Sequence, residues 1–429
     1  MTTTQDVPAG AVNAEVICVG TEILLGDILN TNSQFLALEL AKLGIPHYYQ
    51  TVVGDNPERM AEVIRAACDR AQILIFTGGL GPTPDDLTTE VIAQTFDTPL
   101  EERSEVLADI THKYSRRGRT MAPSNRKQAL LPVGAAVLPN PLGTAPGMIW
   151  EPRPNCLIFT FPGVPREMEQ MWRETVVPYL RSHGFANSLI HSRMLRFWGI
   201  AESTLAEKVD RFLSLQNPTV APYASQGEIR LRVSAKAKSE TEAEALIAPV
   251  AAELQAIAGA DYFGSDSDTL ASVVGKLLSQ AGQTLSVAES CTGGGLGHLL
   301  TTVSGSSTYF KGGIISYDNA VKMELLGVSP SALESLGAVS GTVAEQMAEG
   351  VRSRLKTDWG LSITGIAGPG GGTDTKPVGL VYIGLASSTG VESHAFQFGV
   401  HQQRDFIRWL SACTALDLLR RRLLNTPGD

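Results

Sequence analysis

The sequence lacks the short motifs that usually assign a common chemistry. It contains no Walker A loop, no Gly-x-Gly-x-x-Gly fingerprint and no His-Glu-x-x-His. These absences argue against a classical NTP site, a dinucleotide site and a zinc-peptidase site. Its seven histidines do not cluster. The five cysteines are scattered and no two form a Cys-x-x-Cys, which argues against a disulfide framework and against a zinc ribbon.

Further absences bear on location and partners. Residues 1–10 show no basic-then-apolar signal pattern, and no apolar run is long enough to span a bilayer. We therefore expect a cytoplasmic protein that does not contact a membrane. The net charge of -9 argues against a nucleic-acid partner, although a local basic patch would escape this average.

The chain has the length and composition of a multidomain globular protein. It has 429 residues, of which 43% are hydrophobic and 18% charged. A chain of this length usually folds into roughly two to three domains. Strand-like and helix-like segments alternate in residues 1–182, which predicts an α/β domain with a parallel sheet in three layers. Residues 183–264 predict a small α+β domain, and residues 265–429 a second α/β domain. The expected strands include 15–19, 48–53, 73–77, 156–161, 193–198, 229–237 and 284–288, and the expected helices 33–43, 57–70, 86–96, 102–117, 202–213, 240–257 and 404–424.

A glycine loop with two carboxylates follows the strand expected at 73–77. Its glycines leave main-chain N–H groups free to face a ligand, and the adjacent carboxylates suit a hydrated divalent cation bound to phosphate oxygens. Asp86 is expected to open a helix, and the alternative is a tight turn followed by a capping aspartate. The residues concerned are Gly78, Gly79, Gly81, Thr83, Asp85 and Asp86.

Two further acidic loops follow strands of the same predicted sheet. Glu22 and Asp27 lie after the first strand, and Asp55 lies after the second. Because ligands bind at the carboxyl ends of parallel strands, the three loops predict one metal-assisted phosphate site. We expect Mg²⁺ or Co²⁺ there, with Glu22, Asp27, Asp85 and Asp86 as the candidate ligands.

Ser290 lies between a strand-like stretch and a glycine cluster that opens a helix-like stretch. The strand fixes the hydroxyl, Gly293 and Gly294 allow a close approach to the backbone, and the helix start offers N–H groups to an anion. Lys322 is a candidate base, and a serine with a lysine can hydrolyse amides without histidine or metal. Two alternatives stay open: Lys322 as a solvated surface lysine, and Cys291 as the nucleophile, although no histidine is near it in sequence.

Long ordered motifs resemble the competence/damage-inducible protein CinA family, with its molybdopterin-binding-like N-terminal domain. They cover nearly the whole chain and are least specific across residues 183–265. In the first domain they are 20–22 (Gly-Thr-Glu), 78–83 with 85–86, 121–129, 140–147 (Asn-Pro-Leu-Gly-Thr-Ala-Pro-Gly) and 161–168. In the last they are 288–294, 305–307, 317–322, 365–372 (Gly-Ile-Ala-Gly-Pro-Gly-Gly-Gly) and 376–379.

The resemblance implies two activities on by-products of NAD. The N-terminal domain would hydrolyse ADP-ribose to AMP and ribose 5-phosphate with a divalent cation, and Asp55 and Asp86 match positions that carry function in related enzymes. The C-terminal domain would deamidate nicotinamide mononucleotide (NMN) to nicotinate mononucleotide and ammonia without a cofactor. A homodimer is also expected from the family.

The resemblance also distributes roles among residues. Ser290 matches the nucleophile and Lys322 the base, while Tyr317, Thr364 and Arg404 match further functional positions. Arg404 suits the nucleotide phosphate. Gly368 and Gly370 are expected to cradle phosphate or ribose, and Gly143 with Thr144 to contact substrate in the first domain. The alternatives are an N-terminal module that binds a pterin or nucleotide without turnover, and a regulatory partner protein linked to DNA uptake.

Overall fold

The computed structural model describes residues 12–116, 118–185 and 188–425. The segment 1–10 and the last residue of the helix expected at 102–117 lie outside this part of the chain. Two compact units are present, Met1–His191 with Ala235–Ala245, and Ser192–Ser234 with Leu246–Asp429. Each is described by itself.

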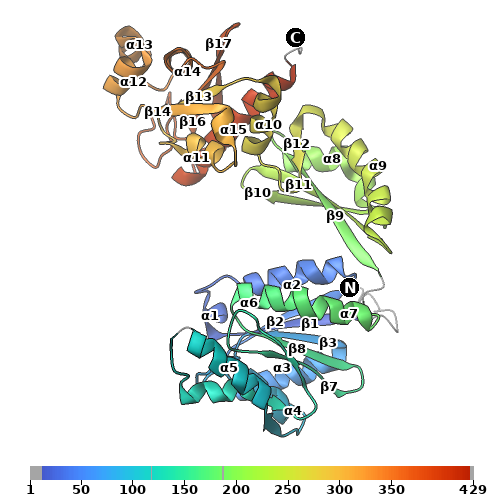
Figure 1. The fold of residues 1–429 in the computed structure, drawn as a ribbon. Helices are drawn as coiled ribbons and strands as arrows, with labels where there is room; N and C mark the ends of the chain where they lie inside the picture. The colour runs from blue at the N-terminus through green and yellow to red at the C-terminus, as the bar shows by residue number, and fades with distance from the viewer. Residues whose placement is uncertain (1–11, 117, 186–187, 426–429) are drawn as a thin grey trace. The chain divides into compact units, whose positions relative to one another are not determined.

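The first unit is built on a six-stranded sheet of order β2-β1-β3-β8-β7-β6 (Figure 1). Strands β2, β1, β3 and β8 are parallel, as predicted, whereas at one edge β7 runs antiparallel to β8 and β6 antiparallel to β7. All residues of β1, β3 and β8 are buried, which is why they read as unbroken apolar runs. The bounds are β1 Ala14–Val19, β2 His47–Val53, β3 Ile73–Thr77, β6 Ala136–Leu138, β7 Gly147–Arg153 and β8 Cys156–Phe161.

Helices cover both faces of this sheet and complete the predicted three layers. One core joins Leu36 and Leu40 of α2 (Thr31–Lys42) and Met168 of α6 (Pro165–Met171) to the sheet. The core on the opposite face joins residues of α3 and α4 to it. The other elements are α1 Thr21–Leu25, α3 Pro57–Arg70, α4 Thr88–Thr95, β4 Leu100–Glu102, α5 Ser104–Arg116, β5 Leu130–Pro132 and α7 Val177–Ser182.

The elements from 189 to 265, called the middle domain below, form a small α+β fold. Its four strands have the order β10-β11-β9-β12. Along β11 buried residues alternate with less buried ones, so one face of the sheet lies in a core, where α8 and α9 cover it (Figure 1). The bounds are β9 Leu189–Phe197, α8 Glu202–Leu213, β10 Thr219–Ser225, β11 Glu228–Ala237, α9 Glu240–Ala258 and β12 Tyr262–Ser265.

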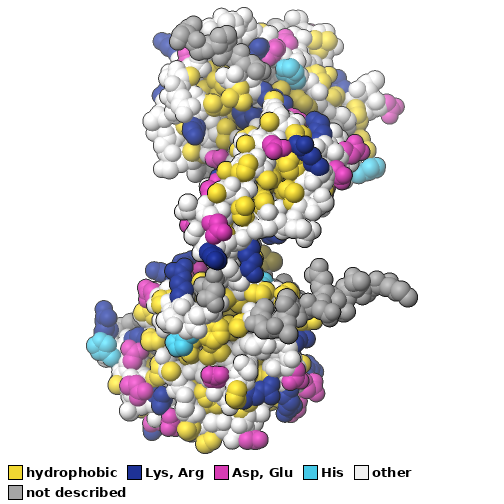
Figure 2. All heavy atoms as spheres, turned by 90° about the vertical axis from the view of Figure 1, so that its right-hand side faces the viewer, with side chains coloured by type: hydrophobic (Ala, Val, Ile, Leu, Met, Phe, Trp, Pro, Cys, Tyr) yellow, Lys and Arg dark blue, Asp and Glu magenta, His cyan; other side chains and the backbone are white. Residues whose placement is uncertain are grey.

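Helix α9 departs from the expectation that no segment could span a bilayer. Among the described residues, the stretch Glu240–Asp261 is long and apolar enough to do so by length and composition alone. Ile247, Ala251 and Leu254 on its inner side are nevertheless fully buried. Its outer side exposes small apolar residues such as Ala252, and Figure 2 shows hydrophobic side chains gathered on this part of the surface.

The C-terminal α/β domain has a five-stranded sheet of order β14-β13-β15-β16-β17. Strands β14, β13 and β15 are parallel, and β16 and β17 are antiparallel to their neighbours. Helices α10, α11 and α15 join one core, while α12, α13 and α14 contribute to a second. The bounds are α10 Leu270–Ala281, β13 Leu285–Glu289, α11 Gly295–Thr301, β14 Phe310–Ile315, α12 Asn319–Leu326, α13 Pro330–Leu336, α14 Gly341–Leu355, β15 Trp359–Gly365, β16 Leu380–Ser387, β17 Gly390–Gln397 and α15 Arg404–Asn425.

Candidate functional site

Ser290 is the first residue after β13, a strand buried along its whole length. Its main-chain N–H donates to the carbonyl of Ile363 on the neighbouring strand β15 at 2.9 Å. The side chain itself is almost buried, with 9% of the residue exposed. The sheet therefore fixes the backbone of Ser290, and its hydroxyl lies at the carboxyl end of the parallel strands.

Lys322 lies against Ser290, as the sequence predicted. Its Nζ atom is 3.2 Å from Oγ of Ser290, and the residue is only 1% exposed. Nζ also donates to the carbonyl of Ser316 at 2.6 Å and to that of Tyr317 at 3.2 Å. Burial at this depth rules out the alternative of a solvated surface lysine.

The surroundings of Lys322 favour its neutral form. Burial lowers the pKa of Lys322 from its usual value, and the charge of Asp318 opposes that shift in part. A neutral amine has two N–H donors and one lone pair. In that form the carbonyls of Ser316 and Tyr317 take both donors and the lone pair accepts from the hydroxyl of Ser290, whereas in the ammonium form Nζ donates to all three oxygens. The first of these arrangements is the one that a general base requires.

Cys291 has the properties of a buried structural residue. Burial raises the pKa of its thiol to about 11, and it is 6% exposed. A thiol with so high a pKa is protonated at neutral pH, and the thiolate is the nucleophilic form. The geometry therefore favours Ser290 over Cys291.

Glu289 is the feature of this site that sequence reasoning missed. Its buried carboxylate accepts hydrogen bonds from the main-chain N–H groups of Gly294, Leu296 and Gly297, at 3.0, 3.0 and 2.8 Å. The expectation that the helix start offers these groups to a substrate anion is wrong, because an internal carboxylate already occupies them. Its sequence signal was an acidic residue that ends a strand just before a glycine-rich helix start.

The glycines after Ser290 allow the tight turn into α11. Gly293 and Gly294 have φ of 56° and 96°, in the left-handed region that other residues rarely adopt.

A second missed residue, Arg408 of α15, donates to the carbonyl of Thr292 at 2.8 Å. Buried hydroxyls of Thr292 and Ser316 have no hydrogen-bond partner in the described part of the chain. Bound substrate or water would satisfy them.

The residues predicted to bind the nucleotide fall into two groups. Arg404 is exposed at the start of α15 and donates to the carbonyl of Gly368 at 2.6 Å and to the hydroxyl of Tyr317 at 3.4 Å. Gly370 lies exposed in the same loop as Gly368. Thr364 is different, since it is buried and its hydroxyl donates to the carbonyl of Ala338 at 2.8 Å. Its hydroxyl therefore has a structural partner.

The first unit contains a cleft of about 640 Å³ where the parallel strands end. The acidic loops predicted from the sequence meet there, since Glu22, Asp55, Asp85 and Asp86 all line it. The glycine loop after β3 and Thr144 also line the cleft. Gly143, beside it, donates its N–H to Oδ1 of Asn140 at 2.8 Å.

Threonines hold the carboxylates of this cleft. Asp55 accepts from the N–H of Thr21 at 3.0 Å and from its hydroxyl at 2.8 Å. Asp86 accepts from the N–H of Thr83 at 2.9 Å and also from its hydroxyl. The side chain of Thr83 also lowers the pKa of Asp85, chiefly by hydrogen bonding.

Asp86 does not open a helix, so that expectation is wrong. Helix α4 begins at Thr88, with Leu87 as its N-cap. The hydroxyl of Thr88 donates to the carbonyl of Gly78 at 2.8 Å, which keeps the preceding turn out of the helix. Asp86 instead closes that turn, and the capping alternative fails for the same reason.

The predicted set of four metal ligands is not assembled. Asp27 is exposed and does not line the cleft. Across residues 12–116, 118–185 and 188–425, no group of three or more His, Cys, Asp or Glu side chains is placed to hold a metal. Mg²⁺ commonly uses only one or two carboxylates together with substrate phosphates. The carboxylates of the cleft fit that mode, and they do not fit a cage made by the protein alone.

Comparison with known proteins gives matches along most of the chain. Three family profiles match, described as "Probable molybdopterin binding domain" over residues 15–182, "Damage-inducible protein CinA KH domain" over 192–264 and "CinA C-terminal domain" over 267–423. A "CinA-like protein" of Rippkaea orientalis is 68% identical over 96% of this chain and 99% of its own length. One of Cyanothece sp. is 66% identical with the same coverage. A solved "competence/damage inducible protein CihA" of Agrobacterium tumefaciens is 39% identical over 36% of this chain and 94% of its own, with a TM-score of 0.35.

Proposed function

This chain belongs to the CinA-like protein family, and we propose that its C-terminal domain hydrolyses the amide of NMN to nicotinate mononucleotide and ammonia. The observation that carries the proposal is the contact between Lys322 and Ser290. A buried lysine with two carbonyls on its N–H donors and a serine hydroxyl on its third position is suited to deprotonating that hydroxyl.

The chemistry divides into two half-reactions. In the first, neutral Lys322 takes the proton of Ser290 as Oγ attacks the amide carbon, and the protonated lysine then gives that proton to the departing ammonia. An ester between Ser290 and the nicotinoyl group remains. In the second, Lys322 takes a proton from water, the hydroxide attacks the ester, and the proton returns to Oγ as nicotinate mononucleotide leaves.

Arg404 supports a nucleotide as the substrate. Its guanidinium lies beside the loop of Gly368 and the hydroxyl of Tyr317, at the carboxyl edge of the same sheet as Ser290. An exposed arginine there suits a phosphate, because a guanidinium donates charge-assisted hydrogen bonds to its oxygens. The phosphate would anchor one end of NMN while the amide meets Ser290.

The N-terminal cleft supports a second candidate activity, hydrolysis of ADP-ribose to AMP and ribose 5-phosphate. Carboxylates face the same space as the glycine loop after β3, which suits a diphosphate with one divalent cation. The cation would neutralise developing charge on the phosphates. Asp55 and Asp86 would orient it or its water, and the loop N–H groups would bind the oxygens.

Two assays test the proposals separately. For the first, the protein is incubated with NMN and EDTA, and nicotinate mononucleotide and ammonia are measured. Formation of both supports the Ser290–Lys322 chemistry, and activity that needs a divalent ion contradicts it. For the second, AMP release from ADP-ribose is followed with Mg²⁺ or Co²⁺. Saturable binding without AMP release would favour a non-catalytic module.

A further inference from the structure

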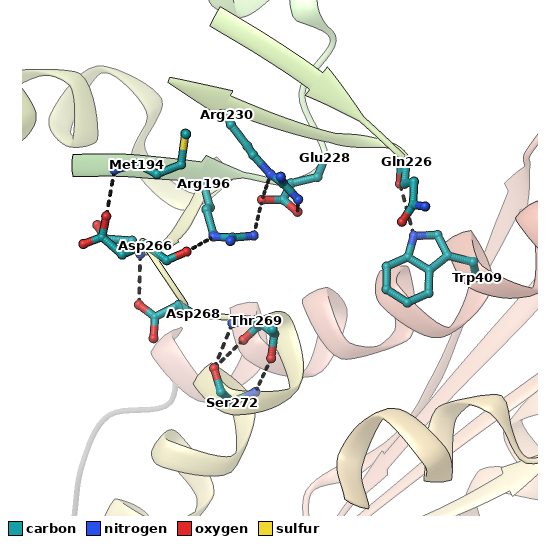
Figure 3. A network of polar contacts seen from close by, with 11 residues as sticks. Met194, Arg196, Gln226, Glu228, Arg230, Asp266, Asp268, Thr269, Ser272 and Trp409 are labelled. Carbon is teal, nitrogen blue, oxygen red and sulfur yellow. Dashed lines mark hydrogen bonds and ion pairs between the residues drawn. The ribbon is translucent and has the colours of Figure 1, made fainter. Parts of the chain in front are cut away.

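A second cavity, of about 200 Å³, lies between the middle-domain sheet and helices of the C-terminal domain. Its residues come from both sides of this boundary, within one compact unit. The sheet contributes Arg196 from β9 and Glu228 and Arg230 from β11, and Trp409 comes from α15 (Figure 3). Neither Ser290 nor any residue of the Lys322 site lines it.

The strands contribute two positive side chains and one negative side chain to the cavity. Glu228 pairs with Arg196 at 2.9 Å and with Arg230 at 3.0 Å, so one carboxylate faces two guanidinium groups. Arg196 also donates from Nε to the carbonyl of Asp266 at 2.7 Å. Arg230 donates from Nε and Nη2 to Glu228, whereas Arg196 donates from Nε to Asp266 and from Nη1 to Glu228. Each guanidinium thus keeps one terminal NH₂ group without a partner among the described residues, and the lining has a net charge of about +1.

The rest of the cavity lining is mostly apolar and partly aromatic. Trp198, Phe263 and Leu270 are each 6% exposed, and Cys413 is 4% exposed. Burial raises the pKa of the Cys413 thiol, so that residue adds no charge. Trp409 is 37% exposed, and its Nε1–H already donates to the carbonyl of Gln226 at 3.1 Å. These residues offer ring faces and aliphatic carbons to an occupant.

Contacts beyond the lining hold the walls in place. Arg420 of α15 is 1% exposed and pairs with Asp417 at 2.6 Å while donating to the carbonyls of Tyr262 and Ala260. Arg421 pairs with Asp261 at 2.9 Å and donates to the carbonyl of Trp198 at 3.0 Å. Helix α15 is thereby fixed to the middle domain on one side of the cavity, so the space exists before any ligand arrives.

We propose that this cavity binds a small aromatic carboxylate. Its volume is below the ~300 Å³ at which sites for drug-sized ligands begin, which selects a single ring. The ring would lie among Trp198, Leu270 and Trp409. Its carboxylate would accept from the unpartnered NH₂ groups of Arg196 and Arg230, a geometry that guanidinium groups favour. The proposal does not depend on the deamidase or on the pyrophosphatase activity.

Isothermal titration calorimetry of the full chain at low salt, with three small molecules as probes, tests the chemical class of the ligand. Benzoate carries both the ring and the charge, benzamide keeps the ring without the charge, and acetate keeps the charge without the ring. We expect benzoate to bind with a dissociation constant below about 1 mM and the other two at least about tenfold more weakly. No saturation by about 10 mM benzoate, or equal binding of benzamide, would overturn the proposal.

Two variants that change the charge of the cavity lining in opposite directions test whether benzoate binds there. Arg230→Gln removes a positive charge and should weaken benzoate binding by about tenfold, whereas Glu228→Gln frees both arginines and should strengthen it several-fold. Arg232→Gln is the matched control, because Arg232 lies on the same strand and the same face but is exposed and does not line the cavity. Benzoate affinity that is the same in all three variants would place any binding elsewhere. If Arg230→Gln unfolds, the increase with Glu228→Gln decides.

Discussion

The carboxylate of Glu289 accepts a hydrogen bond from the N–H of Leu296 at 3.0 Å, although the two residues lie on opposite sides of the Ser290 loop in sequence. With its bonds to Gly294 and Gly297, this contact joins the end of β13 to the first turn of α11. The loop that carries the candidate nucleophile is therefore closed on an internal anion, which the N-terminus of the helix also stabilises.

Glu289→Gln should loosen this loop. The neutral amide offers one oxygen in place of two and directs an NH₂ group at main-chain N–H donors, so we expect a loss of about 2–3 kcal/mol in the free energy of unfolding. The kcat for NMN should fall more than KM changes, because the position of Ser290 shifts. Chemical denaturation measures the free energy of unfolding, and steady-state kinetics measure kcat and KM. Glu334→Gln, at an exposed position of α13, is the control, and unchanged stability and kcat in Glu289→Gln would show that the loop does not need the carboxylate.

The pH dependence of NMN turnover follows from the lowered pKa of Lys322. The neutral amine is the reactive form, so kcat should rise with pH through the lowered pKa of Lys322 and level off below the usual lysine value of about 10.4. Lys322→Arg should abolish the rise together with activity, since a guanidinium stays protonated. Lys311→Arg, at an exposed residue of β14, should keep the wild-type profile. A rate that falls as pH rises across this range would exclude Lys322 as the base.

Arg404→Gln should act on the phosphate of the substrate. Loss of one charge-assisted contact, about 1.5–3 kcal/mol, corresponds to a fall of about 10- to 100-fold in kcat/KM for NMN. Nicotinamide riboside, which lacks the phosphate, should be hydrolysed equally by both enzymes. An equal loss on both substrates would instead mean that Arg404 acts by holding the loop of Gly368.

Asp86→Asn should remove ADP-ribose hydrolysis and spare NMN deamidation. The amide keeps the shape that closes the Thr83 turn but loses the charge that would orient the cation or its water, which should cost several kcal/mol in the transition state. Asp27→Asn is the matched control, because Asp27 lies outside the cleft. AMP release is measured with Mg²⁺ and with Co²⁺. Full pyrophosphatase turnover by Asp86→Asn would take this residue out of the mechanism.

Much of the fold could be predicted because its central strands, such as β1, β3, β8 and β13, are buried along their whole length. Such strands read as short apolar runs between turn residues, and the strand 73–77 and the helix 57–70 were predicted to the residue. The reversal of direction at β7 and at β16 could not be predicted, since it depends on pairing between segments and leaves no local pattern. The start of α4 was misplaced because Thr88 bonds to the carbonyl of Gly78 and Asp86 accepts from Thr83, so both side chains hold the preceding turn and Asp86 does not cap the helix.

The side chains of the candidate site could be predicted from the sequence, but the main-chain groups that position them could not. Ser290 and Lys322 are recognisable by residue type and by the motifs around them. The carbonyls of Ser316 and Tyr317, which place the amine of Lys322, carry no sequence signal, because every residue has a carbonyl. Arg408 was missed for a related reason, since its partner is the main chain of Thr292.

The most direct test of the central claim is the rate of NMN deamidation by Ser290→Ala set against that by Cys291→Ala. If Ser290 is the nucleophile and Lys322 its base, Ser290→Ala loses most of kcat, and adding Lys322→Ala costs little more because the two act as one unit. Cys291→Ala keeps its activity, since a buried thiol with a pKa of about 11 is protonated at neutral pH. An active Ser290→Ala together with an inactive Cys291→Ala would contradict the account.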